Sequence, residues 1–264
     1  MALVLENGIW KLQAAGATST VIWSVDFSAV SDHDFLSTAT LSLGGVTFTA
    51  ENSANASQFE VASGVLKIDP NSLTAHSNNL YNAPVLKGSY SDLMAFAASG
   101  ACDVEKTYVM RAILTSAINP AAGGPIVGIR TDSTTNNEDL SMQTSGASYR
   151  FSKGAARYQD RDRSLTAVTG TVRNLSVVYG QRSAFSGLAG ATDTNEGEPF
   201  GGGAIYAGYV DNVTNATGYN WLSPPPSALD LSDASAQAYV GAWYYSGTDF
   251  GVFSFQRLEL HEVG

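Results

Sequence analysis

Residues 38–50 read Thr-Ala-Thr-Leu-Ser-Leu-Gly-Gly-Val-Thr-Phe-Thr-Ala, and this stretch decides the fold. Polar and apolar side chains alternate on both sides of Gly44-Gly45, the pattern of two half-buried strands joined by a tight turn. Other β-branched and aromatic runs behave alike, among them Thr20–Phe27, Thr107–Thr115 and Val252–His261. About fourteen such runs, separated by turn residues, predict an all-β protein whose two antiparallel sheets pack as a sandwich.

Helical periodicity is short, and we expect one or two short helices. Residues Ser91–Ser99 predict about two turns, capped by Ser91 or Asp92 and ended by Gly100. Neither an internal repeat nor a linker divides the chain. We therefore expect an N-terminal arm or docking strand over residues 1–19 and a single sandwich over residues 20–264.

Composition and charge make several classes of protein unfavourable. The chain has 264 residues, of which 14% are charged, and its net charge is −10, which disfavours a nucleic-acid-binding surface. No apolar run approaches the ~20 residues of a membrane span, so no membrane insertion is expected. One cysteine excludes an intrachain disulfide. The first residues lack the features of a secretory signal peptide, so we expect synthesis and folding in a cytoplasm.

Four stretches suggest a family. They are Val21–Phe27, Phe59–Ile68, Tyr108–Leu114 and Val252–Leu260. Their order resembles the concanavalin A-like (laminin-G-like) jelly roll, which is found in lectins, glycanases and bacteriophage virion proteins. The resemblance implies glycan binding, glycan cleavage or structural packing, often with bound calcium. The fold alone does not choose among these functions.

Enzyme chemistry has little support in the sequence. Glycanases of this fold resemble one another in a Glu-x-Asp-x-x-Glu strand, which is absent here. The nearest acidic pairs are Glu196 with Glu198, in a Gly-rich stretch, and Glu259 with Glu262 near the C-terminus. His261 ends a strand without an evident nucleophile partner. We predict that the protein is not an enzyme, with a glycan hydrolase or lyase as the second alternative.

Oxygen-bearing residues gather where we expect loops. Asp193, Asn195 and Glu196 offer ligands of the type calcium prefers, although the protein requires no cofactor under the main hypothesis. A second group combines aromatic rings with amides, as a sugar site requires. It consists of Asp211, Asn212, Asn215, Tyr219 and Trp221, with loop anchoring or a subunit contact as the alternatives.

Basic residues cluster between positions 150 and 163. A subunit contact is one interpretation, because the rest of a neighbouring copy would be acidic. Mutually paired, solvated charges are the other. The residues concerned are Arg150, Arg157, Arg161 and Arg163.

Together these features favour a non-enzymatic structural protein of a bacteriophage virion, either a capsid decoration or a tail or fibre component. Such a protein folds in the host cytoplasm without a signal peptide and assembles with other virion proteins. We expect a homo-oligomer, with a trimer as the hypothesis. The alternative is a carbohydrate-binding module that recognises a host surface glycan.

Overall fold

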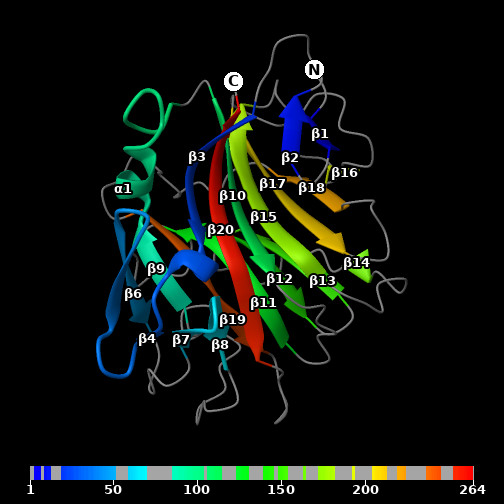
Figure 1. Ribbon diagram of the computed structural model, residues 1–264. Helices are drawn as coiled ribbons and strands as arrows, with labels where there is room; N and C mark the ends of the chain where they lie inside the picture. Colours follow the sequence, from blue (N-terminus) through cyan, green and yellow to red (C-terminus); the bar gives the residue numbers. More distant parts are fainter. Residues whose placement is uncertain are drawn as a thin grey trace.

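The computed structural model describes a large part of the chain. The described residues are 3–6, 9–12, 19–51, 59–69, 85–103, 106–114, 123–130, 139–145, 148–153, 163–164, 172–181, 192–193, 204–212, 219–223, 236–244 and 252–263. They form two stacked sheets, as Figure 1 shows, with β3, β20, β10 and β15 in front of β11, β12 and β13. The all-β sandwich predicted from the sequence is confirmed.

The larger sheet has ten strands, and the C-terminal strand lies near its middle. Strand β20 (Phe253–Val263) pairs with β10 on one side and with both β3 (Ser19–Asp26) and β8 (Val65–Ile68) on the other. Outward from β20, one side continues through β10 (Thr107–Leu114), β15 (Val172–Gln181), β17 (Ala204–Asn212), β18 (Tyr219–Ser223) and β16 (Thr192–Asp193). The other side continues from β8 through β7 (Phe59–Ala62) to β4 (His33–Asp34).

The smaller sheet has eight strands in the order β14-β13-β12-β11-β19-β9-β6-β5. All of its neighbouring strands run antiparallel. The strands are β14 (Arg163–Ser164), β13 (Ser148–Lys153), β12 (Asp139–Ser145), β11 (Gly123–Arg130), β19 (Gln237–Tyr244), β9 (Val85–Ser89), β6 (Val46–Glu51) and β5 (Thr40–Leu43).

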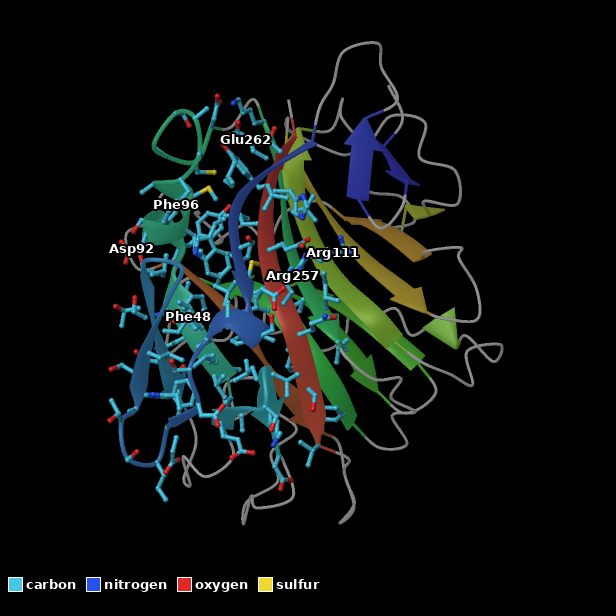
Figure 2. The ribbon with its side chains drawn as sticks, viewed as in Figure 1. Phe48, Asp92, Phe96, Arg111, Arg257 and Glu262 are labelled. Carbon is cyan, nitrogen blue, oxygen red and sulfur yellow. The ribbon has the colours of Figure 1, made fainter. Side chains whose placement is uncertain are left out.

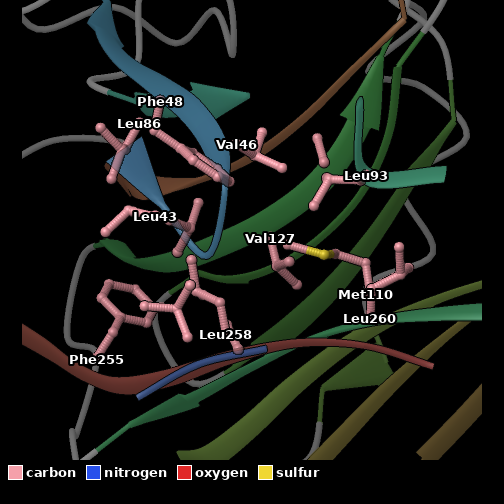
Figure 3. Packing of buried hydrophobic residues seen from close by; sticks show 14 of the residues in the cluster. Leu43, Val46, Phe48, Leu86, Leu93, Met110, Val127, Phe255, Leu258 and Leu260 are labelled. Atoms are coloured by element: carbon pink, nitrogen blue, oxygen red, sulfur yellow. The ribbon is translucent and has the colours of Figure 1, made fainter. Parts of the chain in front are cut away.

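The hydrophobic core lies between the two sheets. Met110, Leu258 and Leu260 from the larger sheet are buried in one cluster with Val127 and residues of β5, β6 and β9 from the smaller sheet (Figure 3). Side chains alternate along a strand, so every second residue of β10 and β20 faces this core. The residues between them face away from it, on what we call the outer face of the larger sheet.

The predicted hairpin at Gly44-Gly45 is confirmed. These glycines join β5 to β6 with φ angles of 57° and 88°, which side chains with a Cβ rarely adopt. The Trp23 indole nitrogen of β3 donates a hydrogen bond to the Gly44 carbonyl at 3.2 Å. The Trp23 ring also stacks on Phe48 of β6, at 5.7 Å between ring centroids. The hairpin of one sheet is thereby attached to a strand of the other.

The predicted helix is shorter and begins earlier than expected. Helix α1 covers Tyr90–Met94, and its N-cap is Ser89, whose hydroxyl accepts a hydrogen bond from the Asp92 amide. Tyr90, Leu93 and Met94 are buried, so packing on the sheet fixes the helical turn. None of the helices in the described ranges is long and apolar enough to cross a membrane.

The N-terminal residues include a small hairpin of β1 (Leu3–Glu6) and β2 (Ile9–Leu12). This hairpin pairs with itself, and β2 lies close to β3 and β20 of the larger sheet. Its role as an arm or docking strand, separate from the sandwich, stays a prediction.

Candidate functional site

Charged residues gather on the outer face of the larger sheet. Along β20, Arg257, Glu259 and His261 alternate with the core residues Leu258 and Leu260. The β10–β20 register places Arg111 opposite Glu259. Figure 2 shows Arg111 and Arg257 at the centre of this sheet. We call Asp26, Arg111, Arg257, Glu259 and His261 the ionic cluster.

Glu259 is the centre of the ionic cluster. Its Oε2 atom accepts hydrogen bonds from His261 Nε2 at 2.9 Å and from Arg111 Nη1 at 3.4 Å. Its Oε1 atom accepts one from Arg257 Nη1, also at 3.4 Å. Arg257 donates as well to Asp26 Oδ2 of β3, at 2.7 Å. One carboxylate therefore contacts two guanidinium groups and a histidine across β10 and β20.

Arg111, Glu259 and His261 are buried although they face away from the core. Only 9% of Arg111, 7% of Glu259 and 2% of His261 is exposed. Burial raises the pKa of Glu259, but the His261 hydrogen bond and the Arg111 charge outweigh burial. The pKa of Glu259 therefore lies below its ordinary value, and its carboxyl is ionised at neutral pH. A carboxylate can only accept, so His261 carries its proton on Nε2.

The Asp26–Arg257 pair connects the ionic cluster to strand β3, which contains Asp26. Hydrogen bonds from Ser28, followed by that from Arg257, lower the pKa of Asp26 to about 2. The hydrogen bond that Arg257 donates to Asp26 raises the pKa of Arg257 in turn. Both groups are about one-third exposed or more, so solvent weakens their attraction more than that of the buried members.

Polar residues continue from the ionic cluster across the sheet. Successive registers connect Arg111 to Ser176 of β15, then to Tyr209 of β17 and Asn220 of β18. On the other side, Glu259 is opposite Ser24 of β3. Residues opposite one another in a sheet share a face. We call Ser24, Glu259, Arg111, Ser176, Tyr209 and Asn220 the polar row. Glu259 and Arg111 are buried, so positions 176, 209 and 220 are its candidate binding positions.

A second, smaller group lies at the end of the same sheet. Lys106 forms an ion pair with Glu262 Oε1, while the buried Oε2 atom of Glu262 has no hydrogen-bond partner among the described residues. Glu262 is opposite Tyr108, whose hydroxyl accepts a hydrogen bond from the Asp103 amide at 2.9 Å. Burial raises the pKa of Tyr108 to about 12, so the phenol stays protonated at neutral pH.

The predicted sugar-binding aromatic residues lie in a strand, which corrects our assignment of them to a loop. Tyr219 and Trp221 belong to β18. The register runs from Trp221 through Gly208 and Val177 to Met110, and Met110 is a core residue. Positions 219 and 221 therefore share the core-facing side of the sheet, because the strand pairing carries the alternation of β10 out to β18.

The other predicted glycan-binding residues are divided. Asp211 and Asn212 end β17, and Asp211 is opposite Asn174 on the outer face. Asn215 lies outside the described residues. Only Asp211 of this group is thus placed on the same face as the polar row, next to it in the register.

The predicted calcium ligands are only partly described. Asp193 lies in β16, which pairs in parallel with β18, and this corrects its assignment to an irregular loop. Asn195 and Glu196 lie outside the described residues. Within the described ranges, no group of three or more His, Cys, Asp or Glu residues could hold a metal ion. Calcium binding by the predicted set stays a prediction.

The basic cluster is split by the sheet. Arg150 of β13 is opposite Gln143, and Arg163 of β14 is opposite Tyr149. Positions 149 and 150 are neighbours in one strand, so Arg150 and Arg163 lie on opposite faces. Arg157 and Arg161 fall outside the described residues. A subunit contact through these arginines stays a prediction, and one sheet face cannot present both Arg150 and Arg163.

Sequence reasoning weighed two members of the ionic cluster and missed their partners. Glu259 and His261 were considered only as catalytic groups, and Arg111, Arg257 and Asp26 were not considered. The available signal was the alternation Arg257-Leu258-Glu259-Leu260-His261, which puts three ionisable groups on one strand face. The partners are 148 and 231 residues distant in the sequence, beyond any local pattern.

Comparison with known proteins gives similarity of fold alone. No protein-family model matches the sequence, and neither does any curated protein. Among solved structures, the chain aligns with the CBM2 module of the evolved Dit of Lactobacillus casei BL23 phage J-1. The identity is 13% and the TM-score 0.44, over 94% of this chain and 97% of that one.

Two other alignments are of the same quality. Arcelin-5, a lectin-like defence protein from Phaseolus vulgaris, is 9% identical with a TM-score of 0.43, over 93% of this chain and 98% of that one. Trypanosoma rangeli sialidase is 12% identical with a TM-score of 0.41, over 99% of this chain and 33% of that one. Peanut lectin and a GH43 glycoside hydrolase are also among the matched structures, at 8% and 10% identity with TM-scores of 0.39 and 0.42.

Proposed function

We propose that this chain is a non-enzymatic structural protein of a bacteriophage virion, a capsid decoration or a tail or fibre component with a lectin-like sandwich. The observation that carries the proposal is the saturation of the ionic cluster. Glu259 and Asp26 are engaged by Arg111, Arg257 and His261 in holding three strands together. A catalytic carboxylate needs access to substrate, which the buried Glu259 lacks, and a general acid needs a raised pKa, whereas the pKa of Glu259 is lowered.

Composition supports an assembled state. The chain has 51 Ser and Thr residues against 38 charged ones, from 14 basic and 24 acidic residues. Interface centres are depleted of charged residues, so a surface of this kind suits contacts with copies and partners. The proposal includes a homo-oligomer, as a trimer, other virion proteins as partners and the virion as the location. Residues 1–19 serve as the docking arm.

Solution mass tests this proposal first. Light scattering at micromolar protein, with and without chelator, is expected to give a stable oligomer that chelator does not change. The purified chain is then expected to bind particles that lack it, and deletion of residues 1–19 to reduce that binding. A monomer that does not attach to particles contradicts the proposal. An oligomer that dissociates on chelation would instead support calcium binding through Asp193, Asn195 and Glu196.

A carbohydrate-binding module is the second candidate, and the polar row favours it. Hydroxyl, amide and phenol groups at Ser176, Asn220 and Tyr209 are residue types that hydrogen-bond sugar hydroxyls and stack on sugar rings. Calorimetry with bacterial surface polysaccharides tests it. Under this reading Tyr209→Ala abolishes the binding heat, whereas Thr47→Ala, at an exposed position of the other sheet, leaves it unchanged. The absence of binding heat for the unmodified chain argues against the module.

A further inference from the structure

The pairing of β20 with its neighbours poses a register problem that the core side does not solve. If β20 moved along β10 by two residues, Leu258 would take the place of Leu260 and Leu260 that of Glu262. Met110 would then still face a leucine, and Tyr108 would face Leu260 in place of Glu262. A two-residue shift keeps the same side chains on the same face, so alternation does not oppose it.

The outer face does oppose this shift. With Leu258 opposite Met110, Arg257 would come opposite Arg111, bringing two cations together. Glu259 would come opposite Val109, which is fully buried. Like charges directly opposite one another destabilise a sheet, and the buried Glu259 would lose Arg111 while keeping only Arg257 and His261 of its own strand.

A shift in the other direction fails for a similar reason. Glu259 would come opposite Ile113 of β10 and opposite Asp26 of β3. His261 would come opposite Arg111. The native register is thus the one that places Arg111 opposite Glu259 and Arg257 opposite Asp26.

We propose that the ionic cluster is a register lock, which selects the pairing of β20 between β10 and β3 by electrostatic matching on the outer face. Its members come from three strands that meet only in the folded chain, at separations of 148 and 231 residues. Buried polar groups that fix register are an established use of such contacts in other proteins. The lock does not depend on the function proposed above.

The most direct test moves the arginine along β10 and measures whether the register of β20 changes with it. The variant V109R/R111V transfers the arginine two residues along β10 without changing the composition. The lock predicts that β20 shifts with it, so that residue 109 faces Glu259 and Met110 pairs with Leu258. Cross-strand nuclear Overhauser contacts between the backbones of β10 and β20 report this pairing. A folded variant in which Met110 still pairs with Leu260 overturns the proposal.

A second variant decides the question if the first does not fold. In D26N/R111M/R257Q/E259M the buried pair is replaced by apolar side chains, a change that proteins often tolerate, and the Asp26–Arg257 pair loses its charges. The lock predicts two sets of Leu258 and Leu260 methyl resonances, from two registers. A single set with native pairing overturns the proposal. The control is E60M/K67M, because the Ser63-Gly64 turn fixes the register of that hairpin and one set is expected.

Discussion

Replacing Glu259 with glutamine tests the ionic cluster most directly. The substitution keeps the shape of the side chain and removes the charge that faces Arg111, Arg257 and His261. Removing one partner of a buried ion pair typically costs about 3–5 kcal/mol, because the remaining charge is left buried. The two guanidinium contacts are long, at 3.4 Å, and Arg257 keeps Asp26. We therefore expect about 3 kcal/mol, the lower end of that range.

Thermal unfolding measures this loss. For a chain of this size, 1 kcal/mol lowers Tm by about 2–4 °C, so E259Q is expected to melt roughly 6–12 °C below the parent protein at pH 7. The matched control is E60Q. Glu60 pairs with Lys67 at the surface, where 48% of its side chain is exposed, and the pair is worth at most about 1 kcal/mol.

The pH dependence supplies an independent check with a definite sign. The folded pKa of Glu259 is lowered, so its stabilisation is fully present above the unfolded value of about 4.3. It is lost as the pH falls through the folded pKa. The Tm difference between the parent and E259Q should therefore shrink as the pH falls below about 4. Equal Tm values for E259Q and E60Q at pH 7 would refute the assigned role of Glu259.

Three further predictions concern other parts of the fold. Gly44→Ala is expected to cost about 1–3 kcal/mol in urea unfolding, because φ is 57° and a Cβ would lie 2.7 Å from Trp23 Nε1; unchanged stability contradicts the turn. Asp26→Asn should lower the stability above about pH 4 but not near pH 2, because Ser28 and an arginine of β20 lower the pKa of Asp26 to about 2. The prediction is contradicted if the Tm difference between the parent and the variant is the same at both pH values. Absorbance titration of the parent protein and of Tyr108→Phe should differ by one phenol that ionises near pH 12, which is Tyr108. A difference near pH 10 would be inconsistent with the burial of Tyr108.

The hairpin and the helix show which parts of the fold the local sequence pattern predicts. Residues 38–50 predicted strands and turn together, because alternation reports which face is buried and paired glycines report positive φ. The helix after β9 was located only approximately. Its cap is Ser89 rather than Ser91 or Asp92, since docking of Tyr90, Leu93 and Met94 sets where the turn begins.

The candidate site depended much less on local pattern. Tyr219 and Trp221 read as loop residues beside polar neighbours, yet β18 pairs with β17 and carries these positions to the core-facing side. Conversely, Arg111 in an apolar strand gave no sign of function by itself. Its meaning came from the register that places it opposite Glu259.

By itself, the sequence determined the class of this protein: an all-β sandwich with its strands, its tight turns and its sparse charge. These are properties of neighbouring residues, fixed by alternation with period two and by the backbone freedom of glycine. Only the tertiary structure decided which strands are neighbours, and with them the ionic cluster and the polar row. Arg257 and Asp26 are 231 residues apart in the chain but 2.7 Å apart in the sheet. Pairing between distant strands depends on the summed packing of both sheets, which no local stretch encodes.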